Sequence, residues 1–202
     1  MTLRTFKSRK TSVMLPLLKN LIRNLVEYAC PIWSPKDSAS INRLEDIQRK
    51  FTSKMSRFRE FDDDLGFTVC TTPYSERLHT LKLLSLQRRR ERHTIIYMFK
   101  IKCSLTPNPG FTADYQIRAK AFAWKPRYDR KTGQNSFFCT GPLLYNSIPA
   151  RIRSLDNMTT PGKTALETFK SQLDKYLTTL PDNPGTQYNS LLNLKDIKQS
   201  CI

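Results

Sequence analysis

The sequence has no apolar run near the roughly 18 residues that a membrane-spanning helix needs. Its first ten residues are basic, and an apolar stretch follows at 13–26. Lys19, Arg23 and Asn24 interrupt that stretch, so it does not qualify as the core of a signal peptide. We therefore expect an intracellular protein, in the nucleus or the cytoplasm, that has no membrane partner.

Metal-binding and catalytic motifs are also missing. The five cysteines are widely spaced without a C-x-x-C, and His79 and His93 are the two histidines. An odd number of dispersed cysteines favours reduced thiols over a disulfide framework. The sequence contains neither a nucleophile elbow nor a glycine loop that cradles phosphate. We expect no metal, no cofactor and no small-molecule substrate.

Acidic residues are scarce relative to basic ones. The chain of 202 residues has 34 Lys and Arg against 17 Asp and Glu, which gives a formal net charge of +17. Such an excess either has an anionic partner or leaves a self-repelling surface. Nucleic acid is the commonest anionic partner, and a membrane surface is the second.

Apolar residues recur at helical spacing in several segments, which predicts a mainly α fold. We expect a helical bundle with an irregular basic insertion and short or no β structure. The predicted helices cover residues 11–29, 38–58, a short stretch after Thr72-Pro73, 85–103 and 164–180. Residues 30–35 should break the first helix, and 60–71 read as an acidic loop. Thr164 and Glu167 form a predicted capping box, and Pro181 ends the last helix.

Three regions follow from this pattern. Residues 1–105 form a helical region, 106–180 an irregular basic segment followed by the C-terminal helix, and 181–202 a polar tail that we expect to be disordered. The irregular part, 106–136, is rich in proline and glycine, and it could include one short pair of strands. Residues 137–155 should form a compact apolar unit of short helical turns.

The best candidates for phosphate contact lie in one arginine run, namely Arg88, Arg89, Arg90 and Arg92. At 100° per residue they cannot all face one direction, so Arg88 and Arg92 share a face and at least one arginine borders the core. A solvated surface, pairing with the acids at 62–64 or a localisation signal are alternative interpretations.

Further cations follow the run, and we add Lys100, Lys120, Lys125 and Arg127 to the candidate nucleic-acid-binding residues. Tyr115, Phe122, Trp124 and Tyr128 are interleaved with them, a pattern that suits single strands. For Phe122 and Trp124 we favour the alternative that they pack inside a small subdomain.

Three sequence blocks carry a family resemblance. Residues 3–55 contain Val26-Glu27-Tyr28, Trp33-Ser34-Pro35 and a helix with Leu44-Glu45-x-x-Gln48-Arg49-x-Phe51-Thr52. Residues 74–101 contain Tyr74-x-x-Arg77-Leu78 and the arginine run. Residues 136–155 read SFFCTGPLLYNSIPARIRSL.

In this order and spacing, the blocks resemble the region after the palm in reverse transcriptases of non-LTR (LINE-type, jockey-like) retrotransposons. Tyr145 stands where that family usually has Trp, and Ile148 where it has Leu. The resemblance implies a multidomain endonuclease and RNA-directed DNA polymerase, of which residues 1–105 correspond to the thumb and its surroundings. The 13–26 face would then pack on a palm that this sequence lacks.

The polymerase active site is missing as well. Two-metal nucleotidyl transfer needs carboxylates that hold two ions about 4 Å apart. The segment Phe61-Asp62-Asp63-Asp64 has the residue types of one such motif, but it lies where the family has a variable loop. We therefore interpret these acidic residues as a solvent-exposed loop and not as metal ligands. We therefore expect no catalysis from this chain alone.

Two functions from different classes remain. The first is a fragment of a retrotransposon reverse transcriptase that binds template–primer or element RNA through a basic helical surface. Its partners would be RNA or DNA and the missing polymerase core. The second is a helical protein-interaction or packing module. A remnant of a decayed element with no function is a third possibility.

Overall fold

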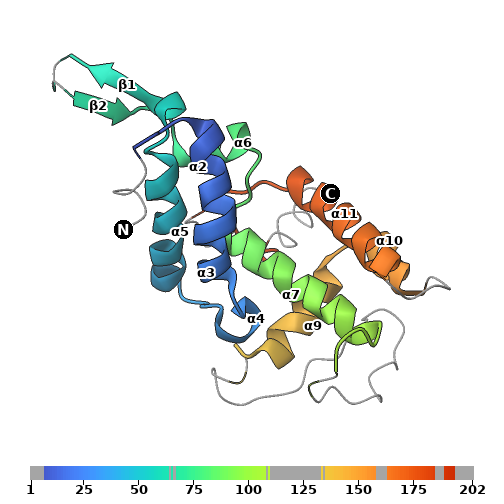
Figure 1. Cartoon of the computed structure of the whole chain (residues 1–202). Coiled ribbons are helices and arrows are strands. Elements are labelled where there is room, and N and C mark those ends of the chain that lie inside the picture. The colour runs from blue at the N-terminus through green and yellow to red at the C-terminus, as the bar shows by residue number, and fades with distance from the viewer. Residues whose placement is uncertain are drawn as a thin grey trace, which may run out of the picture.

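The computed structural model describes residues 7–63, 65, 67–107, 109, 133, 135–157, 163–184 and 189–193. These residues form helices and one two-stranded sheet (Figure 1), which confirms the predicted mainly α class. The predicted irregular basic segment, with its strand pair, falls mostly at 110–132 and lies outside the described residues.

The first helix contains a π turn that the sequence did not predict. It runs as α2 (Thr11–Leu17), the π turn η1 (Leu18–Ile22) and α3 (Arg23–Glu27). A π turn holds one residue more than an α turn, so it rotates the residues beyond it. Met14 and Leu18 are buried as predicted, but Leu25 turns to solvent and Arg23 turns inward, with 4% of its surface exposed. Ile22 still packs against the core, but Leu21 and Leu25 face solvent, so the predicted single apolar face does not continue unbroken beyond Leu18.

The segment after α3 also differs from expectation. Ala29 adopts a left-handed backbone conformation with φ 49°, and it ends the first helix. The expected break of the first helix is therefore present, but Cys30–Trp33 then forms a single helical turn, α4, that was not predicted. Pro31 is compatible with this turn because a proline in the first turn of a helix loses no hydrogen bond.

The second predicted helix is α5 (Ser38–Thr52), which ends six residues before the predicted boundary. Its N-terminus is capped by Asp37, whose carboxylate accepts a hydrogen bond from the Ser40 amide at 2.7 Å. A 3₁₀ turn, η2 (Ser56–Phe58), follows, and Met55 and Phe58 are still buried.

The expected acidic loop is a β-hairpin. Strands β1 (Arg59–Asp62) and β2 (Phe67–Cys70) pair antiparallel, with Glu60 opposite Val69 and Phe61 opposite Thr68. Aromatic and β-branched residues favour strands, and here they outweigh the acidic residues between them. The hairpin projects from the helical body (Figure 1).

The remaining helices surround α7 (Leu86–Lys102), which lies near the centre of the molecule (Figure 1). Ser85 caps α7 by accepting a hydrogen bond from the Arg88 amide at 3.1 Å. The other elements are α6 (Tyr74–Thr80), α9 (Phe137–Ser147), α10 (Ala150–Arg153), the 3₁₀ turn η4 (Ser154–Asn157) and α11 (Lys163–Thr179).

The core consists of two hydrophobic clusters. The N-terminal cluster joins α2, η1, α5 and α6 through Met14, Leu18, Phe51, Met55, Phe58 and Leu78. The C-terminal cluster joins α7, α9, α10 and α11, and the Phe99 and Phe169 rings stack there with centroids 4.0 Å apart. Because α7 belongs to the C-terminal cluster, the two clusters divide before α7.

The chain after Pro181 differs from the predicted disordered tail where the structure describes it. Asn189 and Leu191 are buried, and Leu191 belongs to the C-terminal cluster. The Asp182 carboxylate accepts a hydrogen bond from the Ser85 amide at 2.7 Å. Residues 189–193 therefore pack on the body beside α7.

Candidate nucleic-acid interface

Two arginines of the predicted binding run are inside the protein. Arg88 is fully buried, and its Nη2 donates to the carbonyl oxygens of Pro181 at 3.1 Å and Asn189 at 2.9 Å. Arg90 is 1% exposed, and its guanidinium nitrogens have no hydrogen-bond partner among the described residues. Burial lowers the pKa of Arg90, while nearby carboxylates such as Glu45 counteract that shift.

This placement corrects the prediction that Arg88 and Arg92 present one phosphate-binding face. The expectation that at least one arginine borders the core is confirmed, and two of the four are buried. Arg88 instead ties the chain after Pro181 to α7. Within the run, Arg89 and Arg92 are the arginines that retain partial solvent exposure.

Arg89 and Arg92 each make a bidentate ion pair. Arg89 binds the Glu27 carboxylate, with Nη2 2.7 Å from Oε2. Arg92 binds the Asp174 carboxylate of α11, with Nη2 2.8 Å from Oδ2. Paired in this way, both guanidinium groups are fixed in orientation at the mouth of one cavity.

This cavity, which we call the basic pocket, has a volume of about 470 Å³. It lies between η1, α3, the turn before α7, and the facing surfaces of α7 and α11. Its charged lining comprises five cations and one carboxylate, namely Lys19, Arg23, Lys82, Arg89, Arg92 and Asp174. A cation surplus in a concave site attracts anions more strongly than the same charges spread over a flat surface.

Arg23 forms the inner wall of the basic pocket. Its Nε and Nη2 donate to the Gln48 side-chain oxygen at 3.2 and 3.1 Å, and Nη2 reaches the Leu84 carbonyl at 3.5 Å. Burial, followed by the nearby charge of Arg89, lowers the pKa of Arg23 to about 10. Arg23 remains charged at neutral pH, and an anion in the pocket would offset its repulsion with Arg89.

Glu27 holds Arg89 from the opposite side. Its carboxylate also lies 2.9 Å from His93 Nε2. Burial alone would raise the pKa of Glu27, but the hydrogen bonds from Arg89 and His93 outweigh it and lower the pKa to about 2. Glu27 is therefore a carboxylate at neutral pH, and it positions Arg89 without facing the pocket.

Sequence reasoning missed three of the five cations, Lys19, Arg23 and Lys82. Lys19 and Lys82 are exposed single cations, and Lys82 sits in a tight turn with φ 50°. Arg23 carried a signal, since a charged residue inside an apolar helical stripe needs a buried partner. Of the other candidates, Lys100 is half-buried near the end of α7, and Lys120, Lys125 and Arg127 lie outside the described residues.

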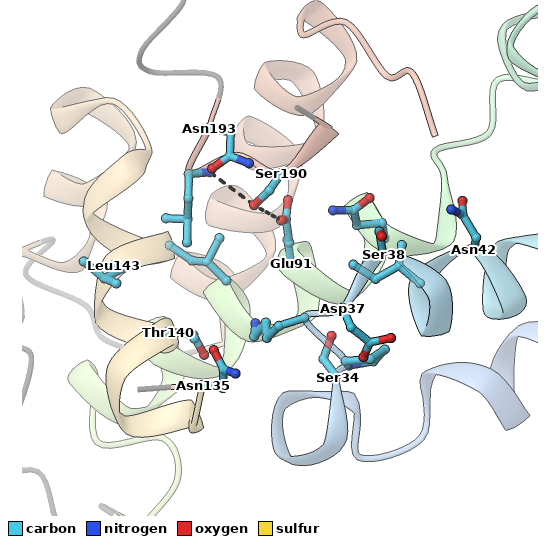
Figure 2. Close-up of a pocket in the computed structure, with 16 residues that line it drawn as sticks. Ser34, Asp37, Ser38, Asn42, Glu91, Asn135, Thr140, Leu143, Ser190 and Asn193 are labelled. Atoms are coloured by element: carbon cyan, nitrogen blue, oxygen red, sulfur yellow. Dashed lines mark hydrogen bonds between the residues drawn. The ribbon is translucent and has the colours of Figure 1, made fainter. Parts of the chain in front are cut away.

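A second cavity, of about 740 Å³, is different in character. Its charged lining consists of Lys36 with the carboxyl groups of Asp37 and Glu91, so it lacks a cation surplus. Figure 2 shows Ser190 pointing at Glu91, and its hydroxyl donates to the Glu91 carboxylate at 2.6 Å. The Leu191 amide donates to the same carboxylate at 3.1 Å. Glu91 thus fixes the chain at 189–193, and this cavity does not suit phosphate.

The Asp-rich motif lies at the end of β1. The Asp62 carboxylate accepts a hydrogen bond from the Leu65 amide at 3.1 Å, which closes the turn of the hairpin. Within the described part of the chain, no cluster of three His, Cys, Asp or Glu residues could hold a metal ion. No helix in that part is long and apolar enough to cross a membrane.

Comparison with known proteins adds no relative from which a site could be transferred. No protein-family model, curated protein or solved structure matches this chain.

Proposed function

We propose that this chain binds the phosphate backbone of RNA or DNA through the basic pocket. In this proposal it is the helical portion that follows the palm of a LINE-type reverse transcriptase, and it grips template–primer or element RNA there. The observation that carries the proposal is the basic pocket itself, in which five cations face one carboxylate. The quoted sequence blocks support the assignment to that family.

The chemistry of the pocket suits phosphate groups. Arg89 and Arg92 present guanidinium groups whose Nε and Nη2 are engaged by Glu27 and Asp174, and the donors that remain on each group are oriented for contact with phosphate. Lys19 and Lys82 are exposed and add mobile positive charge at the rim. Contacts of this kind position a nucleic acid without reading its bases. We therefore propose binding with little sequence preference and a steep dependence on salt.

The test replaces the two rim lysines, Lys19→Gln with Lys82→Gln, because neither residue is needed for packing. Affinity for RNA or DNA should fall to a similar extent across sequences, and the log–log salt slope should become shallower by about 1–2 units. Fluorescence anisotropy over a salt series measures both quantities. Circular dichroism verifies that the fold is retained.

The matched control is Lys54→Gln with Lys175→Gln, which removes the same charge from exposed positions that do not line the pocket. If the control weakens binding as much as the rim variant does, general charge and not the basic pocket binds the nucleic acid. If neither variant changes the salt slope, the proposal is wrong.

The proposal assigns no catalysis to this chain alone, because the paired carboxylates of a polymerase palm are not recognisable in its sequence. A packing or protein-interaction module is the second candidate function. The exposed apolar side chains of α3 and α4 favour it. A mainly apolar interface changes little with salt, so the same salt series separates the two functions.

A further inference from the structure

A row of apolar side chains faces solvent on the first helices. Leu25 and Ile32 are 80% and 83% exposed, which is unusual for residues of their size. The exposed stripe, as we call it, consists of Leu21, Leu25, Tyr28, Ile32 and Trp33. The Trp33 indole donates to the Tyr28 carbonyl at 2.5 Å, which joins α4 to the end of α3. Several exposed large apolar side chains within one short segment favour an interaction site.

The margins of the exposed stripe are positively charged. Residues 7–36 contain one acid, Glu27, and it is held beneath Arg89 by their ion pair. Lys19 and Lys36, which flank the stripe residues in the chain, are exposed. A partner for this surface therefore needs apolar side chains flanked by carboxylates.

The β-hairpin has this composition. Phe61 and Phe67 are 66% and 57% exposed, and Leu65 beside them is also exposed. Phe61 pairs with Thr68 and Phe67 with Asp62, so the two rings lie on opposite faces of the hairpin. By the same alternation Glu60 and Asp62 lie on the face of Phe67, so this face presents an aromatic ring flanked by carboxylates, and Asp63 is exposed beside the turn.

The two surfaces lie at opposite ends of the molecule. In Figure 1 the hairpin extends beyond the start of α2, while α4 lies at the far end of the α2–α3 rod. The hairpin of one molecule therefore cannot cover its own exposed stripe. A second molecule can supply the missing surface, because each copy carries both.

We propose that the β-hairpin of one copy docks on the exposed stripe of a second copy, with apolar contacts at the centre and carboxylate–lysine contacts at the rim. The contact is head-to-tail, so it leaves one hairpin and one stripe open in every dimer. Longer chains, or a ring if the rotation closes, follow from repetition of the same contact. None of the five stripe residues lines the basic pocket, although Lys19 lies at the margin of both surfaces. Substitutions in the stripe or the hairpin therefore test self-association while every cation of the pocket is kept.

The experiment uses two double variants of the full chain, freed of nucleic acid by nuclease and ion exchange. The stripe variant is Leu25→Ser with Ile32→Ser, and the hairpin variant is Phe61→Ser with Phe67→Ser. Sedimentation velocity over a concentration series should show that the wild type associates and that each variant alone stays monomeric. An equimolar mixture of the two variants should form dimers, because one variant retains the stripe and the other retains the hairpin.

The mixture is the decisive sample. If the hairpin variant alone still dimerises, the stripe contacts another stripe and the proposal is wrong. A wild type that is monomeric throughout, or a mixture that remains monomeric, also overturns it and assigns these surfaces to a different partner.

Circular dichroism melts check that all variants are folded.

A third variant, Glu60→Lys with Asp63→Lys, keeps the aromatic side chains and tests the charge complementarity. Its self-association should be about tenfold weaker, in line with the loss of roughly 1.4 kcal/mol of rim attraction. Unchanged self-association of this variant would remove the electrostatic argument and with it the assignment of the hairpin as the occupant of the stripe.

Discussion

Several side chains of the motifs on which the family resemblance rests are buried and bind one another. In the Leu44–Thr52 motif, Glu45, Gln48 and Thr52 are fully buried polar residues. Gln48 donates to the Tyr74 hydroxyl at 3.1 Å, and Tyr74 in turn donates to Glu45 at 2.5 Å. Buried polar groups need such partners, because an unpaired one costs about 1–3 kcal/mol. These motif residues therefore act in folding, and the proposed binding falls to the solvent-facing cations.

Glu27 gives a residue-scale prediction about acid stability. Its folded pKa of about 2 lies below the ordinary value of 4.5, so the charged carboxylate stabilises the folded state above about pH 4.5. This stabilisation is lost as the pH falls toward 2. Between pH 5 and pH 2 the wild type should lose on the order of 3 kcal/mol more than Glu27→Gln does.

Urea unfolding at a series of pH values measures that difference. Glu76→Gln, at an exposed position on α6, is the matched control for removing one carboxylate. Parallel pH profiles for the wild type and Glu27→Gln would mean that the Glu27–Arg89–His93 cluster contributes nothing to stability.

At the scale of elements, helical periodicity located most of the helices but not their irregularities. Leu21 and Leu25 continue the spacing of Met14 and Leu18, and the sequence pattern carries no sign of the π turn that rotates them outward. Likewise, Met55 and Phe58 extend the stripe of α5 although the helix ends at Thr52. Buried side chains at helical spacing thus do not require a continuous helix.

The candidate site was predictable only in part. The composition of the arginine run drew attention to α7, and Arg89 and Arg92 do line the basic pocket. The burial of Arg88 depends on Pro181 and Asn189, which lie about a hundred residues further along the chain. Lys19 and Lys82 join the pocket through tertiary packing, which no local pattern encodes. The hairpin was predicted as a loop because acidic residues, which are uncommon in strands, interrupt the alternation of apolar residues at 59–70.

The crossing of α7 and α9 supports a second prediction. A Cβ atom at Gly141 would lie 2.9 Å from Met98 Sδ and 3.0 Å from a Phe137 ring carbon. In an open helix, Gly→Ala stabilises by about 1 kcal/mol. Here Gly141→Ala should instead destabilise the protein by roughly 1–3 kcal/mol, because close-packed neighbours must move.

Thermal unfolding of Gly141→Ala against the wild type tests this packing. The companion variant is Gly141→Ala with Met98→Ala, in which the larger obstacle is removed. A destabilisation that is unchanged by the loss of Met98 would place its origin elsewhere. A rise in melting temperature for Gly141→Ala alone would contradict the close approach of the two helices.

At the scale of the whole molecule, polar contacts join the two hydrophobic clusters. The Glu45 carboxylate of α5 accepts hydrogen bonds from the Leu86 and Gln87 amides at 3.1 and 3.3 Å, so it caps the N-terminus of α7. The Gln48 amide donates to the Leu84 carbonyl at 3.1 Å. A negative group at a helix N-terminus is favourable. These contacts tie the N-terminal cluster to the start of the central helix.

This coupling predicts that the wild type unfolds in one cooperative transition, with equal calorimetric and van't Hoff enthalpies. Glu45→Ala should break the coupling, because it leaves two amide donors and the Tyr74 hydroxyl without their buried acceptor. The expected loss is on the order of 3–5 kcal/mol, and the van't Hoff enthalpy should fall below the calorimetric one as the clusters melt separately.

Glu45→Gln is the matched control. Burial raises the pKa of Glu45, so a neutral side chain that keeps an acceptor oxygen is a smaller perturbation. Its transition should stay single. Two transitions in the wild type would show that the clusters are not coupled, and a single one in Glu45→Ala would show that they are joined by something other than this carboxylate.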